Sequence, residues 1–146
     1  MENNTVMSDH QVFVAIASLQ IAKLVTFYSD FFSSISDLNG SKTTILPVVS
    51  SSGYAEFHLA GLKLALFEPS ANHVTEFSAT SGPAMSDTAI SLCIEVSDLK
   101  GAIAHLTAMG YPPPGEIIHA AHGQEIYAYD PDGNRLILHQ AIATSD

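Results

Sequence analysis

The side chains best suited to chemistry lie in the second half of the sequence. His119, His122, Glu125 and His139 carry the imidazoles and the carboxylate that could bind a divalent metal ion. His119 and His122 stand three positions apart in a strand-like segment, which would turn their side chains to opposite faces of a sheet unless a bulge intervenes. We therefore interpret these histidines as ordinary hydrogen-bonding residues, and a displaced metal site is the alternative.

Other reactive side chains have structural explanations. Cys93 is the only cysteine, which excludes an internal disulfide framework. We predict it to be a small core residue, because no histidine is placed to activate its thiol. Asp130 and Asp132 belong to an Asp-Pro-Asp-Gly segment, whose composition is typical of a tight turn rather than of a catalytic carboxylate pair. His58 is predicted to be a strand residue with no special role.

Composition and charge define the broad class of protein. The 146 residues are 47% hydrophobic and 14% charged, which suits one domain with a substantial core. No apolar run approaches the length of about 18 residues that crosses a bilayer, and the polar N-terminal segment does not resemble a signal peptide. We expect a cytoplasmic protein. The net charge of −10 argues against nucleic-acid binding and is compatible with cationic or neutral small molecules.

The first half of the chain predicts one helix among four strands. Runs of apolar residues indicate the strands, and a stripe of apolar residues three or four apart indicates the helix. Pro47 confines its strand to a sheet edge or a bulge. The expected order is a strand at 11–17, a helix at 20–34 and strands at 43–49, 54–60 and 62–67.

The second half repeats this order after a segment at 69–87 that is rich in turn residues and is interpreted as a linker. Residues 61–66 also align with residues 133–138, each beginning with glycine and continuing with a basic residue two positions on. Each half is too small to bury a comfortable core alone, so we expect the halves to pair. The second order is a strand at 88–96, a helix capped by Asp98 and ended by Gly110, and strands at 116–121, 124–129 and 134–139.

Three motifs stand at the junctions of these elements: AKLVTFY at 22–28, IEVSDL at 94–99 and YAYDPDGNRL at 127–136. With the duplicated order of elements, they make residues 11–140 resemble the vicinal oxygen chelate superfamily, which contains glyoxalases, extradiol dioxygenases and bleomycin-resistance proteins. The resemblance implies an α+β fold in which two tandem βαβββ modules form a U-shaped mixed sheet around a pocket, with helices on its outer face. We expect one domain over 1–146, with modules at about 11–68 and 88–140.

The resemblance also implies where a metal would sit. In the enzymes of this family, side chains from the first and last strands of each module usually hold a divalent ion, which acts as a Lewis acid on two neighbouring substrate oxygens. The positions that match are Phe13, Ala65, Ser91 and Ile137. Three of these side chains have no donor atom, and a neutral serine is a poor sole ligand. We therefore predict no metal and no cofactor.

The family geometry and the alternation of side chains along a strand predict what lines the pocket. One face of the strands is uniformly apolar and is expected to lie under the helices: Val12, Val14, Ile16, Leu64, Leu66, Ile90, Leu92, Ile94, Leu136 and Leu138. The other face is mixed, as in small-molecule sites. The residues expected to bind a ligand are Phe13, Lys63, Ala65, Phe67, Ser91, Glu95, Tyr127, Tyr129, Arg135, Ile137 and His139.

Two of these assignments have competing explanations. Glu95 beside Lys63 or Arg135 would be either an acid–base pair or ligand anchor, or an ion pair that closes the cavity mouth. Tyr127 and Tyr129 would either stack a planar ligand or pack within the sheet.

The function expected from the sequence is the metal-free binding of a small molecule, similar in kind to the bleomycin-resistance proteins. The unknown ligand would be cationic or aromatic, and we expect a homodimer that binds neither nucleic acid nor membrane. A metal-dependent lyase, isomerase or dioxygenase with an atypical site is the first alternative. A regulatory or scaffold module whose pocket has closed is the second.

Overall fold

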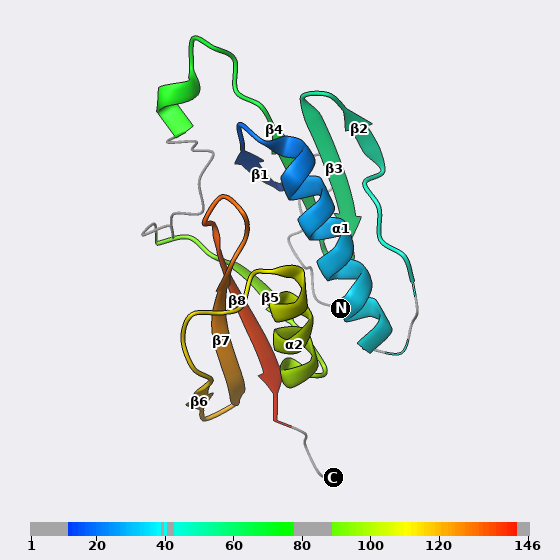
Figure 1. The fold of residues 1–146 in the computed structure, drawn as a ribbon, viewed down its shortest axis with the longest axis vertical. Helices are drawn as coiled ribbons and strands as arrows, with labels where there is room; N and C mark the ends of the chain where they lie inside the picture. The colour runs from blue at the N-terminus through cyan, green and yellow to red at the C-terminus, as the bar shows by residue number, and fades with distance from the viewer. Residues whose placement is uncertain (1–11, 39, 41–42, 78–88, 143–146) are drawn as a thin grey trace, which may run out of the picture.

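The N-terminal half folds as one βαβββ module. A computed structural model describes residues 12–38, 40, 43–77 and 89–142 (Figure 1). The strands form a mixed sheet in the order β1-β4-β3-β2, with β1 parallel to β4 and the other pairs antiparallel. A short 3₁₀ helix, Val74–Phe77, follows. The elements are β1 (Val14–Ala17), α1 (Ile21–Leu38), β2 (Val49–Ser51), β3 (Tyr54–Leu59) and β4 (Leu62–Phe67).

The C-terminal half repeats the same module. Its sheet has the order β5-β8-β7-β6, again with the first and last strands parallel. The predicted α+β fold of two βαβββ modules is confirmed. The elements are β5 (Leu92–Glu95), α2 (Leu99–Met109), β6 (Ile118–Ala120), β7 (Gly123–Tyr129) and β8 (Arg135–Ala141).

The observed elements differ from the predicted ones mainly at their ends. The strand predicted at 43–49 is observed instead as β2 at Val49–Ser51, which shares only Val49 with the prediction, because Pro47 cannot donate a ladder hydrogen bond. Helix α1 continues past residue 34 to Leu38, since Ile35 extends its buried stripe. Most of the predicted linker lies outside the described residues, and the part within them contains the 3₁₀ helix.

Helix α2 is bounded by the two residues predicted to cap and end it, Asp98 and Gly110. The Asp98 carboxylate accepts a hydrogen bond of 3.0 Å from the backbone N–H of Gly101, which caps the first turn of α2. At the other end, Gly110 adopts a φ of 98°, and its N–H donates to the carbonyl of Thr107. This left-handed conformation is accessible to glycine without strain, so the helix ends there.

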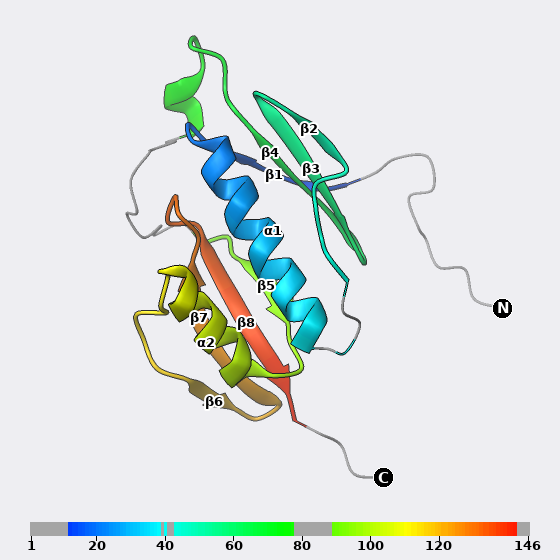
Figure 2. The ribbon, with the colours of Figure 1, turned by 45° about the vertical axis from the view of Figure 1, so that its right-hand side comes forward.

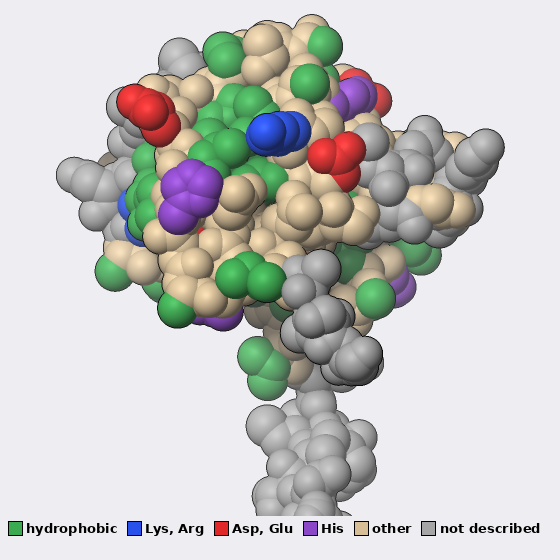
Figure 3. Space-filling view, turned by 90° about the horizontal axis from the view of Figure 1, so that it is seen from below, with side chains coloured by type: hydrophobic (Ala, Val, Ile, Leu, Met, Phe, Trp, Pro, Cys, Tyr) green, Lys and Arg blue, Asp and Glu red, His purple; other side chains and the backbone are tan. Residues whose placement is uncertain are grey.

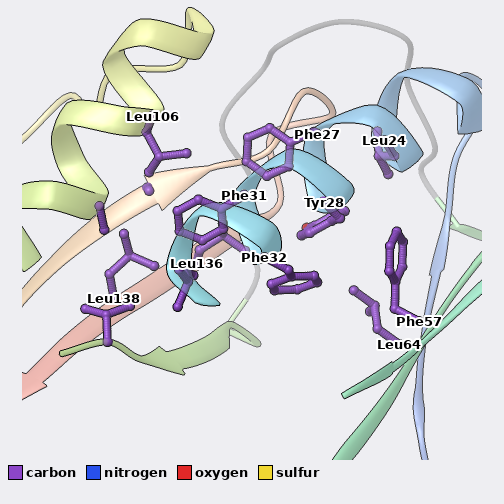
Figure 4. Packing of buried hydrophobic residues seen from close by; sticks show 14 of the residues in the cluster. Leu24, Phe27, Tyr28, Phe31, Phe32, Phe57, Leu64, Leu106, Leu136 and Leu138 are labelled. Carbon is purple, nitrogen blue, oxygen red and sulfur yellow. The ribbon is translucent and has the colours of Figure 1, made fainter. Parts of the chain in front are cut away.

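Helix α1 lies between the two sheets and contacts both (Figures 1 and 2). Phe27 and Phe31 lie on the side of α2 and β8, where Leu106, Leu136 and Leu138 are fully buried (Figure 4). Tyr28 and Phe32 lie on the side of the first sheet, with ring centroids 6.5 and 5.8 Å from that of Phe57. One helix therefore supplies core side chains to both modules, and each module buries its apolar sheet face against it.

Polar contacts fix the modules to each other at the N-terminal end of α1. The Tyr28 hydroxyl donates a 2.7 Å hydrogen bond to Asp130 Oδ2 in the β7–β8 turn, and Gln20 Nε2 donates to Asp132 Oδ1. Asp130 also accepts from the backbone N–H groups of Asp132 and Asn134 and from the Asn134 amide. Burial raises the pKa of Asp130, and these hydrogen bonds partly oppose that rise.

The surface of the molecule is not uniformly polar. Viewed from below Figure 1, it shows a patch of hydrophobic side chains with a basic side chain at its edge and acidic side chains further out (Figure 3). Contiguous exposed apolar surface of this kind is where soluble proteins bind ligands or partners.

The contact between Tyr28 and Asp130 can be tested by removing one hydroxyl. Tyr28→Phe keeps the ring and leaves the buried carboxylate without one donor, so we expect the free energy of unfolding in urea to fall by about 1.5–3 kcal/mol. Tyr111→Phe is the matched control, because the Tyr111 ring also contacts Phe27 while its hydroxyl has no hydrogen-bond partner among the described residues. Equal losses in the two variants would contradict a specific role for the Tyr28 hydroxyl.

Candidate functional site

The predicted alternation of side chains divides each sheet into a helix face and an open face. Leu64, Leu66, Leu136 and Leu138 are fully buried on the helix faces, as predicted. The prediction is wrong for Val12, Val14 and Ile90, which are 79%, 38% and 83% exposed. These three residues belong to or precede β1 and β5, which are edge strands of the two sheets. Because α1 lies between the sheets, the two open faces are turned away from each other.

A charged cluster occupies the open face of the first sheet. Glu56 Oε1 lies 2.8 Å from His58 Nε2 and 3.9 Å from Lys63 Nζ, while Glu56 Oε2 accepts a hydrogen bond from the Tyr54 hydroxyl. The hydrogen bonds from Tyr54 and His58, with the nearby Lys63 charge, hold the pKa of Glu56 below its ordinary value. Lys63 Nζ also lies 4.9 Å from the centroid of the Phe13 ring, a cation–π contact.

Sequence reasoning selected Phe13 and Lys63 for this site but missed the residues between them. The predicted set does not include Glu56 or Tyr54, and His58 is predicted to have no special role. A signal was available, because Tyr54, Glu56 and His58 alternate along β3 with residues that face the helix. The register then places Glu56 opposite Ala65, which is fully buried beneath these side chains.

At the other end of this open face, the ring of Phe77 covers the ring of Phe67. The Phe67 ring meets the Phe77 ring of the 3₁₀ helix edge to face, with centroids 5.2 Å apart. Phe67 therefore packs against its own chain. Phe13, which directly precedes β1, remains 42% exposed and accessible to a ligand.

The open face of the second sheet carries a carboxylate–imidazole pair. Glu95 Oε1 lies 2.7 Å from His139 Nδ1, and Glu95 Oε2 accepts a hydrogen bond from the backbone N–H of Ala141. The structure thus gives Glu95 a partner other than the predicted Lys63 or Arg135. Sequence proximity could not reveal this pairing, because it depends on the parallel register that sets Glu95 beside His139.

The remaining predicted residues lie along the same face. Arg135 Nε donates a 2.6 Å hydrogen bond to Ser91 Oγ, and the two residues help to line a cavity of about 180 Å³ between β1 and β5 that also includes Ala15. Tyr127 is opposite Ile137 and 40% exposed, and it lines a separate groove with Tyr129. The predicted set is therefore divided among several pockets of one chain.

Cys93 is exposed on this open face, so the prediction that it is a small core residue is wrong. Its position opposite Ile137 explains the difference, since odd-numbered residues of β5 point away from the helices. Partial burial and the nearby carboxylates of Glu125 and Glu95 raise the pKa of the thiol. The thiol is therefore protonated at neutral pH, which makes it a weak nucleophile.

The donor atoms present do not fit the metal centre that the resemblance implies. In the register of the sheets, Ala15 is the direct neighbour of Ala65, and Cys93 is the direct neighbour of Ile137. Apart from Cys93, whose thiol is protonated, and Ser91, these positions offer no side-chain ligand. Within the described residues, no group of three or more His, Cys, Asp or Glu side chains is placed to hold a metal ion.

Comparison with known proteins identifies the fold. No protein-family model and no curated protein matches the sequence. The structure is similar to the fosfomycin resistance protein FosX from Listeria monocytogenes (17% identity, TM-score 0.64, covering 93% of each chain). It is also similar to a glyoxalase-related enzyme from Fulvimarina pelagi (19% identity, TM-score 0.64, covering 89% of this chain and 87% of that one). A third similar structure is a glyoxalase/bleomycin resistance protein/dioxygenase from Nocardioides, with 17% sequence identity and a TM-score of 0.62. The match covers 97% of this chain and 90% of that one.

These likenesses confirm the predicted resemblance at the level of the fold. The chain has the fold of the vicinal oxygen chelate proteins over nearly its whole length. Because a shared fold carries many different activities, the reaction or ligand has to be argued from the side chains of the open faces.

The cluster around Glu56 predicts a pH-dependent contribution to stability. A carboxylate whose folded pKa is lowered stabilises the fold above its ordinary value of 4.5, and that contribution is lost as the pH falls through the folded pKa. We therefore expect Glu56→Gln to unfold at a lower temperature than the wild type at pH 7, with the gap closing towards pH 3. Glu76→Gln removes an exposed pair with His73 and should show no gap at either pH. A gap for Glu56→Gln that is constant with pH would contradict this interpretation.

Proposed function

We propose that this chain is a glyoxalase/bleomycin-resistance-like protein that binds a small molecule without the metal of the related enzymes. The observation that carries the proposal is the side-chain set at the expected metal positions, Phe13, Ala65, Ser91 and Ile137, together with their neighbours in the register. Phenylalanine, alanine and isoleucine cannot donate electron pairs to a cation, whereas they can bury apolar ligand surface.

The open faces supply the contacts that the ligand would make. The exposed rings of Phe13 and Tyr127 and the side chain of Ile137 would contact the apolar part of the ligand. Glu95, with Arg135 and His139 as neighbours on the same face, would orient its polar groups. The net charge of −10 favours a cationic or neutral aromatic ligand over an anion.

A metal-dependent enzyme with an atypical site is the alternative function. The observation that favours it is the structural similarity to FosX, which has been crystallised with Mn(II). Such an enzyme would need ligands from residues outside the matched positions, such as Glu56 and His58 on the first open face and Glu95, Glu125 and His139 on the second.

We further propose that the binding protein is a homodimer in the cytoplasm. The open faces of one chain point in different directions, so a two-sided pocket would form when the first sheet of one chain meets the second sheet of another. The exposed apolar residues Val12 and Ile90 beside the edge strands β1 and β5 supply surface for this contact. The single, unpaired Cys93 accords with a reducing compartment.

The described helices include none that is both long enough and apolar enough to cross a membrane.

Binding without metal can be tested on the purified protein. After incubation with Mn²⁺, Ni²⁺ or Zn²⁺ and desalting, we expect elemental analysis to find well below one ion per chain. In a thermal-shift screen, cationic aromatic compounds should raise the melting temperature, because a ligand at 100 times its Kd adds roughly 2.7 kcal/mol to the native state. Phe13→Ala together with Tyr127→Ala should abolish that shift. Stoichiometric metal that is required for turnover would instead establish the enzyme.

Dimerisation can be tested by light scattering coupled to size exclusion. We expect a mass of two chains for the wild type and of one chain for Ile90→Lys, because a buried, unpaired lysine at the edge of β5 opposes association. Ile142→Lys is the matched control, since Ile142 is 55% exposed at the far end of β8. A wild type that stays monomeric at high concentration would contradict the proposed assembly.

A further inference from the structure

We propose that the seam between the two modules of a single chain holds a second binding site, for a compact apolar molecule that carries a positive charge. The site is a cavity of about 340 Å³ between the C-terminal half of α1, the β3–β4 hairpin and β5. Cavities of roughly 300–1,000 Å³ are the size that takes small organic ligands. Its lining residues are Phe32, Ile35, Ser36, Leu59, Ala60, Leu62, Leu92, Cys93, Ile94 and Glu95.

The cavity exists because the apolar faces of the sheets extend further than the helix that covers them. Leu64 and Leu66 on β4 are fully buried, but Leu62 on the same face remains half-buried. On β5, Leu92 and Ile94 are likewise half-buried. These side chains point towards the core, but no other side chains cover them completely. Protein interiors are ordinarily packed with few voids, so the space beside these residues is unusual.

The walls come from parts of the chain that the core holds in place. Phe32 and Ile35 form one wall and are almost completely buried on α1. Leu59 and Leu62 form the opposite wall and are cross-strand partners next to the Ala60-Gly61 turn. A cavity built on a helix and a tight hairpin is largely preformed, so little ordering has to accompany binding.

The charge of the rim selects among apolar ligands. Glu95 is the only charged residue of the lining, and its side chain is 60% exposed beside an apolar floor. Its carboxylate oxygens contact His139 and the backbone of Ala141, which fixes the carboxylate at the cavity edge. A ligand with an ammonium group next to its apolar body would match this arrangement, and an anion would be repelled.

This site goes beyond the proposed function and does not depend on it. The open-face site uses Phe13, Tyr127 and Ile137 and needs a second chain, whereas the seam cavity lies mainly on the helix side of the sheets within one chain and reaches the open face at Cys93 and Glu95. Glu95 lies at the boundary of both. The two proposals can therefore fail separately.

The neutral fluorescent probe N-phenyl-1-naphthylamine tests the cavity directly. We expect saturable binding to the wild-type protein, and displacement by hexyltrimethylammonium at about fivefold lower concentration than by hexyl sulfate, as a screened charge pair gives. Glu95→Gln should retain the probe and lose this preference. Equal or better displacement by hexyl sulfate from the wild type would overturn the assignment of a cationic ligand.

A cavity-filling variant locates the probe. Ala60→Trp places an indole at the exposed turn that lines the cavity and should abolish saturable binding, while Ala22→Trp adds the same ring at an exposed position of α1 outside the lining and should not. Phe13→Ala and Tyr127→Ala should leave probe binding unchanged. Equal binding by the two tryptophan variants, or loss with the open-face variants, would overturn the seam site.

Cys93 provides a measurement that needs no cavity-filling variant. It lies on β5 at the edge of the cavity, with its exposed thiol on the open face. Bound hexyltrimethylammonium should slow the reaction of this thiol with a disulfide reagent equally in the wild-type protein and in Phe13→Ala. This keeps the proposal testable if Ala60→Trp does not fold. An unchanged reaction rate at concentrations that displace the probe would overturn it.

Discussion

The structure depends on a single helix that has two buried faces. Helix α1 packs Tyr28 and Phe32 towards the first sheet and Phe27 and Phe31 towards the second module, so neither module has a complete core without it. The Tyr28 hydroxyl adds a directional contact to Asp130, 102 positions away in the sequence. Because the helix lies between the sheets, their polar faces must point outwards. The division of the candidate site into separate pockets, and the incompletely covered seam beside β5, both follow from this placement.

Much of the local structure could be predicted from the sequence, because it depends on nearby residues. The apolar stripe of α1, the Asp98 cap and Gly110 end of α2, and the Asp130 turn are all signals within a few positions of the element they define. The alternation of side chains along the strands also predicted which face is buried, and the prediction is correct where a helix covers that face, as at Leu64, Leu66, Leu136 and Leu138. Val12 and Ile90 deviate because exposure at a sheet edge is decided by where distant elements end.

The candidate site was harder to predict, because its contacts cross between strands. The residues of its faces could be chosen from alternation, but the pairing of Glu95 with His139 requires the register of β5 against β8. Similarly, Glu56 gains its partners from both its own strand and β4. The open faces contribute little to the core, so the side chains there can change while the apolar helix faces preserve the fold. This explains how a chain 17% identical to FosX retains its architecture although three of its four expected metal positions have no donor atom.

The parallel pairing of the first and last strands of each module has a consequence for biosynthesis. Val14 pairs with Leu64, fifty positions later, so β1 has no sheet partner until the remainder of its module has left the ribosome. Phe27 and Phe31 then stay uncovered until the second module is complete, because their contacts come from α2 and β8. Contacts this distant in sequence slow folding and prolong the exposure of aromatic surface. The aromatic face of α1 is therefore among the last parts of the core to be covered as the chain folds.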